Sequence, residues 1–272
     1  MSAARLSVVW TLALAVTLAS AVWQRRTGPS YPARGAVTLG GERIEYRLAR
    51  SHVTGSDQPV RVAAGGTETT GEVLWRHFPG TEPFAELAMR REGGELVAAL
   101  PSQPPAGKLE YRVRLRAGAE EVLLPPEPAV TRFRGAVPAA VLVPHIGAMF
   151  LGMLFSNAAG LSAVLARPRA ARQGSVALAL LAVGGLLLGP VVQKYAFGAF
   201  WTGFPYGTDL TDNKTALAVL AWGVAVVAAA RGRWARAAIV AAALVTLVVF
   251  AVPHSLFGSE LRREPASAGP AG

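Results

Sequence analysis

Five long apolar stretches limit what this chain of 272 residues can fold into. They lie at 6–23, 138–165, 175–195, 213–230 and 234–256. The last four each have the roughly 20 residues that an α-helix needs to cross a hydrocarbon core about 30 Å thick. We therefore predict a four-helix transmembrane bundle over 137–258, preceded by an N-terminal hydrophobic helix.

The N-terminal stretch, residues 1–26, has two interpretations. Ala19-Ser20-Ala21 offers the A-x-A pattern of a signal-peptide cleavage site. However, the apolar run continues through Trp23 and ends at Arg25-Arg26, as a membrane anchor with an interfacial tryptophan does. We favour a retained anchor helix and keep the signal peptide as the alternative.

Between these apolar segments, residues 27–136 have a period of two residues instead of 3.6. Short runs of this kind are typical of strands. They lie at 37–39, 43–48, 60–63, 72–78, 86–89, 95–100, 109–115, 122–123 and 130–133. Turn residues such as Gly93-Gly94 and Pro125-Pro126 separate them. Many short strands at this spacing predict an all-β sandwich.

The segment Pro105-Ala106-Gly107-Lys108-Leu109-Glu110-Tyr111 resembles the entry to strand F of immunoglobulin and fibronectin type III domains. The resemblance implies an immunoglobulin-like fold in which Tyr111 forms a tyrosine corner. Trp75 is the candidate for the core tryptophan of strand C. A domain of this kind is usually a binding or spacing module, and its fold implies no catalysis.

Arginines dominate the net charge of +10, and their positions favour a membrane orientation over nucleic acid binding. Two short loops carry them without any acid: Arg167, Arg169 and Arg172, then Arg231, Arg233 and Arg236. The positive-inside rule places both loops in the cytoplasm. The β domain, the aromatic loop 195–212 and the tail 259–272, which we expect to be disordered, then lie outside. Together with the Ala-, Arg- and Gly-rich usage, this predicts a bacterial inner membrane protein with a periplasmic domain.

Metal and disulfide chemistry are restricted because the chain has no cysteine. Disulfides, thiolate zinc sites and iron–sulfur clusters are excluded. Two membrane histidines remain, His145 and His254, each in a Val-Pro-His tripeptide near the outer end of its helix. With Met149 and Met153 on the same helix face as His145, they are candidate ligands for haem b or copper. The alternative is that the methionines pack and His145 is hydrogen-bonded to a neighbouring helix.

Other polar residues gather at the same outer depth, while Asn157 lies toward the inner end of its helix. Intramembrane polar residues are candidate functional residues because they are costly in lipid. The outer polar cluster comprises Gln193, Lys194, Asp209, Asp212, Asn213 and Lys214. Asp212 is a candidate N-cap for the fourth bundle helix. The loop before it has six aromatic residues among 195–206, and we expect a lid that packs over the helix ends.

A GxxxG spacing at Gly185 and Gly189 predicts close approach of a neighbouring helix. Several longer strings are distinctive: QRRTGPSYP, PAGKLEY, GPVVQKYAFGAFWTG, DLTDNKT and PHSLFGSEL. Together they resemble an uncharacterised class of bacterial multi-pass membrane proteins. The resemblance implies a membrane location and transfers no functional residue.

Three functions compete on these observations. The first is a redox or metal-related protein holding haem b or copper through His145 and His254. The second is a scaffolding or assembly subunit that binds a membrane or periplasmic protein partner at the outer face. The third, an enzyme using Asp209 and Asp212 as acid–base groups, ranks last because the chain has no G-x-S-x-G, H-E-x-x-H or P-loop signature. We prefer the assembly subunit, with the metal protein as the alternative.

Overall fold

The structure is a computed structural model that describes residues 3–64, 66, 68–165 and 168–253. The described residues divide into a helical unit, formed by 3–31 together with 136–253, and a β unit within 32–135. Three residues or regions singled out in the sequence, Arg167, His254 and the tail 259–272, lie outside the described residues.

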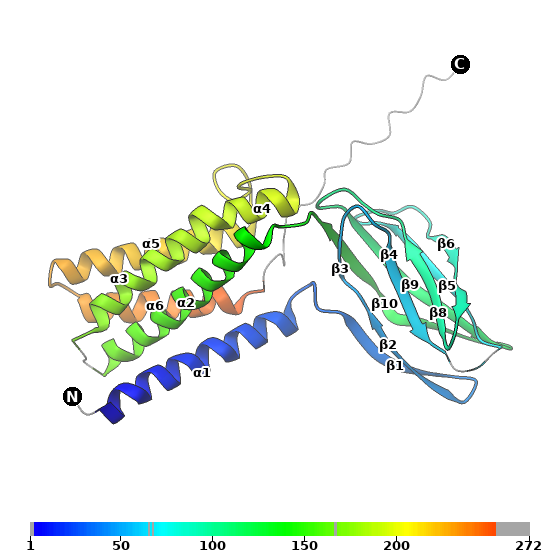
Figure 1. Cartoon of the computed structure of the whole chain (residues 1–272), viewed down its shortest axis with the longest axis horizontal. Helices are drawn as coiled ribbons and strands as arrows, with labels where there is room; N and C mark the ends of the chain where they lie inside the picture. Colours follow the sequence, from blue (N-terminus) through cyan, green and yellow to red (C-terminus); the bar gives the residue numbers. More distant parts are fainter. Residues whose placement is uncertain (1–2, 65, 67, 166–167, 254–272) are drawn as a thin grey trace, which may run out of the picture. The chain divides into compact units, whose positions relative to one another are not determined.

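The helical unit contains helices that run side by side (Figure 1). They are α1 (Ala3–Thr27), α2 (Ala139–Val164), α3 (Ala170–Leu181), the π-helical η1 (Ala182–Leu188), α4 (Gly189–Phe197), α5 (Leu210–Ala230) and α6 (Ala235–Ala251). Four are long and apolar enough to cross a membrane: α1, α2, α5 and the unbroken run α3–η1–α4. The last, α6, is apolar but has only 17 residues, which span about 26 Å at 1.5 Å per residue. These helices fit a multi-pass membrane protein.

The N-terminal helix α1 packs against α2 and α6. Asn157 of α2 donates its Nδ2 hydrogen to Thr17 Oγ1 at 3.0 Å. Near the C-terminal end of α1, Gln24 Nε2 donates to the carbonyl of Phe250 in α6 at 3.0 Å. Side-chain bonds therefore link α1 to two helices of the bundle.

Small residues form most of the bundle's core. Alanines from α2, α3, α5 and α6 surround the fully buried Trp222, whose indole donates to Thr246 Oγ1 at 2.9 Å. A Cβ on Gly174 would lie only 2.5 Å from the Trp222 ring. Close backbone approach of this kind is typical of helices that associate in lipid, where small residues allow van der Waals contact.

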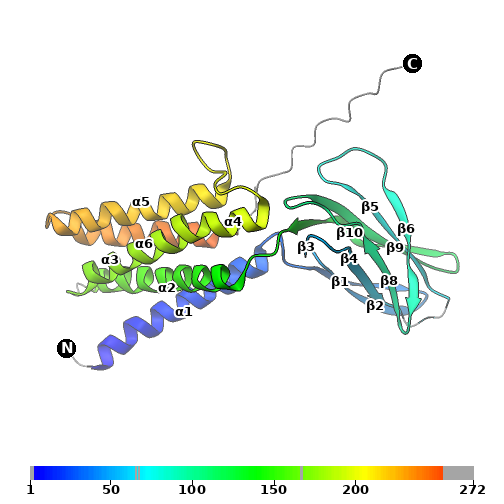
Figure 2. The same cartoon turned by 45° about the horizontal axis from the view of Figure 1, so that its top comes forward.

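The helices alternate in direction, which sorts their ends into two sets (Figure 2). What we call the polar end contains the start of α2, the end of α4, the start of α5 and the end of α6. The arginine end contains the end of α2, the start of α3, the end of α5 and the start of α6. At the arginine end, Arg236 donates to the carbonyl of Val164 at 2.7 Å, which ties α6 to α2.

The β unit has three sheets. Its strands are β1 (Ala33–Leu39), β2 (Glu42–Leu48), β3 (Ser51–Val53), β4 (Gln58–Ala63), β5 (Thr70–His77), β6 (Ala85–Ala88), β7 (Arg90–Glu92), β8 (Glu95–Leu100), β9 (Lys108–Ala117) and β10 (Glu120–Arg134). The sheet orders are β1-β2, β3-β10-β9-β5-β6 and β4-β8-β7. Apolar side chains from all three sheets join in one buried cluster. Each predicted strand overlaps one of these elements, although 72–78 and 86–89 each extend one residue past the end of β5 and β6; the short β3 and β7 were not predicted.

One strand contradicts a predicted turn. Pro125-Pro126 was expected to separate two strands, but β10 runs through both prolines. Its pairing with β9 shifts register between Leu124 and Ala129. A bulge accommodates residues that have no N–H to donate to a sheet ladder.

Tyr111 lies fully buried on β9, paired in register with Trp75 on β5. Its hydroxyl donates to the carbonyl of Ala49 at 2.7 Å, 62 residues upstream. In a tyrosine corner the hydroxyl bonds to the backbone only a few residues upstream. Tyr111 therefore does not form the predicted tyrosine corner. Burial raises the pKa of the Tyr111 phenol well above its ordinary value.

Candidate functional site

His145 lies in the second turn of α2, facing the π-helical turn η1. Its Nδ1 is 2.8 Å from the carbonyl oxygen of Gly184. That carbonyl also accepts the N–H of Gly189. Because a carbonyl oxygen only accepts, Nδ1 carries a proton in this contact. A neutral imidazole held this way keeps the lone pair of Nε2.

The widened helix next to His145 has a local cause. Pro190 has no N–H for the carbonyl four residues before it, and its ring crowds that carbonyl. The π-helical turn η1 ends at Leu188, two residues before this proline. Such π-turns are frequent at functional sites in helices.

The predicted methionine stripe packs beside the same turn. A Cβ on Gly184 would lie 2.9 Å from Met149 Sδ, so the thioether occupies the space that the glycine leaves. Met153 is 4% exposed. Gly185 approaches the Thr215 side chain of α5. A Cβ on Gly189 would lie 3.8 Å from His145 Cε1. Met149 thus fills a gap between α2 and η1.

Asp212 is the centre of the polar end. It lies in the first turn of α5, is 7% exposed, and turns back toward the loop between α4 and α5. Its Oδ2 accepts the backbone N–H of Thr202 at 2.7 Å and that of Gly203 at 3.0 Å. A Cβ on Gly203 would lie 2.6 Å from Asp212 Cβ, so only glycine allows this close approach. Gln193 of α4 joins the group by donating to Thr202 Oγ1 at 2.6 Å.

The predicted N-cap at Asp212 is wrong. Helix α5 begins at Leu210, and its N-cap is Asp209, whose side chain accepts from Thr211 N at 2.8 Å and Asp212 N at 3.3 Å. Asp209 offers the same capping chemistry three residues earlier. The Asp212 carboxylate is thereby left to bind the loop. Asn213 adds to this, since its Oδ1 accepts the N–H of Phe204 at 2.7 Å.

The two lysines of the cluster bind helix C-termini. Lys214 is 6% exposed and donates to the carbonyl of Val252, the C-cap of α6, at 2.5 Å. Lys194 donates to the carbonyl of Gly198, the C-cap of α4, at 2.8 Å. A cation at the last carbonyls of a helix satisfies them and opposes the negative end of the helix dipole.

Aromatic side chains project from the loop that Asp212 and Asn213 hold. Phe200 is 57% exposed, Phe204 80% and Tyr206 84%. The Trp201 indole instead turns inward along the loop and donates to the carbonyl of Phe204 at 3.1 Å. The loop is therefore fixed through its backbone while most of its rings face outward.

The sequence therefore located the polar residues, and the structure shows how they divide. Gln193, Thr202 and Asp212 form one hydrogen-bonded group, His145 binds η1, and Lys214 binds the end of α6. The prediction that His145 and His254 share a ligand lies outside the described residues, because His254 is not among them. Within the described ranges, no three His, Asp or Glu side chains are placed to hold a metal ion.

Thr202 and the carbonyls of Gly184 and Val252 were missed. No side-chain pattern marks a backbone carbonyl, and a threonine in an aromatic loop has no distinctive spacing. Pro190, with Gly184, Gly185 and Gly189 in the residues before it, was the available signal for η1. In comparisons with known proteins, no family model and no curated sequence matches this chain.

Proposed function

We propose that this protein is a membrane scaffolding or assembly subunit that binds a protein partner at its polar end. One observation carries the proposal: the buried Asp212 holds the backbone of a loop whose Phe204 and Tyr206 are more than three-quarters exposed. Aromatic side chains are enriched where proteins bind one another. A loop held in place before binding loses less conformational entropy when a partner docks.

The bonding of the other polar residues supports a structural role for them. His145, Lys194 and Lys214 each contact a backbone carbonyl at a helix turn or end. None of these contacts forms a nucleophile–base pair of the kind that acyl transfer requires. Their arrangement fits a network that ties helix ends to the loop.

The orientation we propose puts the polar end and the β unit outside a bacterial inner membrane. Arg169, Arg172, Arg231 and Arg233 supply the support, because they lie at the opposite, arginine end and favour the cytoplasm. The cysteine-free chain offers a direct test. A membrane-impermeant maleimide should label Tyr206→Cys in intact cells and Arg172→Cys only after lysis; the reverse pattern would contradict the orientation.

We also propose that the β unit is an immunoglobulin-like sandwich. Its strand orders supply the support: β4-β8-β7 follows the B-E-D order, and β5, β9 and β10 follow C, F and G. Trp75 then lies on the strand equivalent to C and Tyr111 on that equivalent to F. An experimental structure of the full chain tests this assignment, because two sheets packed face to face are required and a closed barrel would contradict it.

The test of the partner is a photo-cross-linking amino acid at position 206 in living cells. The assembly proposal predicts a discrete protein adduct that disappears in the Asp212→Ala background. The same cross-linker at position 220, on the exposed face of α5, is the control and should yield lipid adducts. Lipid adducts at both positions would make the exposed rings an interfacial belt and would contradict the proposal.

A metal-binding function is the second candidate, and one observation favours it. His145 donates from Nδ1 to a backbone carbonyl, the arrangement that orients a histidine to bind haem iron or copper through Nε2. His254 would supply the second ligand. Purified protein should then show a Soret band or stoichiometric copper that His145→Ala abolishes. If the assembly role holds, His145→Ala lowers stability without changing the spectrum.

A further inference from the structure

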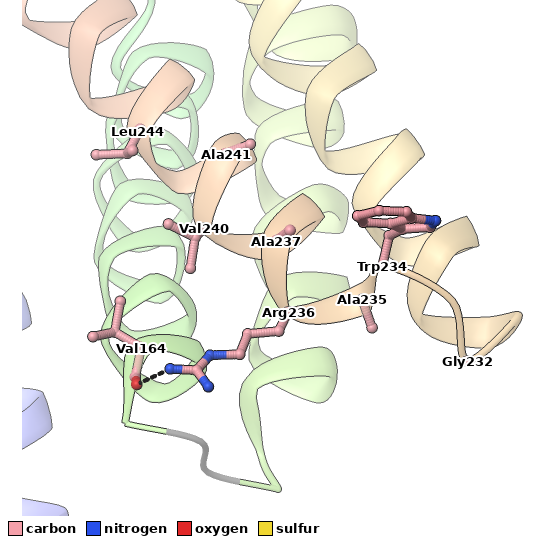
Figure 3. Close-up of a pocket in the computed structure, with 9 residues that line it drawn as sticks. All are labelled: Val164, Gly232, Trp234, Ala235, Arg236, Ala237, Val240, Ala241 and Leu244. Carbon is pink, nitrogen blue, oxygen red and sulfur yellow. Dashed lines mark hydrogen bonds between the residues drawn. The ribbon is translucent and has the colours of Figure 1, made fainter.

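Two apolar grooves meet at Trp234, at the arginine end of the bundle. The first, with a volume of about 770 Å³, runs along the exposed face of α6 past Ala237, Ala241 and Leu244, and reaches Val164 of α2. The second, of about 890 Å³, lies among α3, α5 and α6. Trp234 lines both. Figure 3 shows the indole on one side of the α6 start and the Arg236 guanidinium on the other.

Trp234 has an unusual conformation for its size. Its φ is 57°, a backbone region in which bulky side chains are strained. Its ring is nevertheless 79% exposed, so burial within this chain does not offset the strain. Strained residues of this kind concentrate at ligand and functional sites. Tryptophan also favours the headgroup level of a bilayer.

The same position is strongly cationic. Arg231 and Arg233 line the second groove and Arg236 lines the first, with no acid between α5 and α6. Arg236 uses one N–H to bind the Val164 carbonyl, and a guanidinium has five. The first turn of α6 has no side-chain cap and no acid, so its N–H groups and dipole also favour an anion.

We propose that this end of the bundle binds an anionic phospholipid astride Trp234. The phosphate lies against Arg233, Arg236 and the start of α6, and one acyl chain occupies each groove. Both grooves run along helices long or apolar enough for the bilayer, which selects a lipid over a soluble anion. Zwitterionic headgroups are disfavoured because their ammonium group would face three arginines. The inference is independent of the proposed assembly role.

The test is native mass spectrometry of the full chain in detergent with equal amounts of phosphatidylglycerol and phosphatidylcholine. The wild-type chain should retain phosphatidylglycerol preferentially. Arg233→Gln and Arg236→Gln should each reduce that preference about fivefold. Because Arg236 also ties α6 to α2, Arg233→Gln is the cleaner variant. Ala241→Leu, which fills the first groove on an exposed face without changing charge, should reduce retention of both lipids.

Arg172→Gln is the matched control, since it removes an exposed arginine at the same end that lines neither groove. It should leave the preference unchanged. Equal retention of the two lipids by the wild-type chain would overturn the proposal. So would a loss in Arg172→Gln as large as that in Arg233→Gln, because it would show that net charge alone attracts the lipid.

Discussion

The cores of the β unit and of the helical unit differ in the size of their apolar side chains. The β core consists of large side chains such as Leu109, Tyr111 and Phe133. The bundle core consists mainly of alanine around Trp222. Water drives the first core together by the hydrophobic effect, whereas in lipid the helices gain by close backbone packing. The same chain therefore has two regions that should fail in different ways.

Polar side chains differ between the two regions as well. Among the described residues, every ion pair lies in the β unit, as in the Arg114 pairs with Glu72 and Glu86. In the bundle, cations bind backbone carbonyls at helix ends, as Lys214 and Arg236 do. Buried polar atoms without a hydrogen-bond partner among the described residues occur in both regions: Arg112 Nε in the β unit, and Ser156 Oγ and Gln173 Oε1 in the bundle.

Removing a large side chain should harm the β unit most. Phe133→Ala deletes a ring that is fully buried in the β core, and we expect a loss of about 3–5 kcal/mol. Leu220→Ala in α5, where the side chain is 67% exposed, should change stability by less than about 0.5 kcal/mol. Chemical unfolding in detergent micelles, followed separately for each unit, measures both. Similar losses at the two sites would contradict the claim that Phe133 belongs to a packed β core while Leu220 lies on an exposed face of α5.

Adding a methyl group should harm the bundle instead. Gly174→Ala places a Cβ 2.5 Å from Trp222, and overpacking of this kind costs about 1–3 kcal/mol. The control is Gly223→Ala in α5, whose Cβ would meet nothing within 4 Å. The control should retain or slightly raise helix stability, because alanine is the better helix former. Unfolding in micelles compares the two variants.

A buried hydrogen bond should contribute more in the β unit than between helices. Tyr111→Phe removes the bond to the Ala49 carbonyl, which then keeps only its contact from Gln58 Nε2 at 3.2 Å, at a cost of about 1 kcal/mol. Asn157→Leu removes the bond to Thr17, and interhelical bonds of this kind average about 0.6 kcal/mol. Denaturant titrations of both variants test the order, and a larger loss for Asn157→Leu would reverse it.

The smallest effect concerns pH. A hydrogen bond from Arg114 lowers the pKa of Glu72 below its ordinary value of 4.5. The folded state therefore holds the carboxylate more strongly than the unfolded chain does. The stabilisation is fully present at neutral pH and is lost as the pH falls below 4.5 through the folded pKa. Arg114→Gln should weaken this acid sensitivity in the β unit, measured by thermal unfolding between neutral and acidic pH.

Regular periodicity explains what could be predicted from the sequence. The apolar stretches and the period-two runs each repeat one signal over many residues, so the helices and most strands were found. Single contacts were not predictable. The carboxylates of Asp209 and Asp212 have the same capping chemistry, and only the position of the loop decides which one caps α5. Similarly, Tyr111 bonds to Ala49, a partner that no local spacing indicates.

The central claim is that the buried carboxylate of Asp212 holds the aromatic loop in place. Hydrogen exchange of the amides of Thr202 and Gly203, measured by mass spectrometry in lipid nanodiscs, tests it most directly. The wild-type amides should be protected, Asp212→Asn should retain part of the protection through its remaining carbonyl oxygen, and Asp212→Ala should lose it. Rapid exchange in the wild-type chain, or equal protection in Asp212→Ala, would contradict the account.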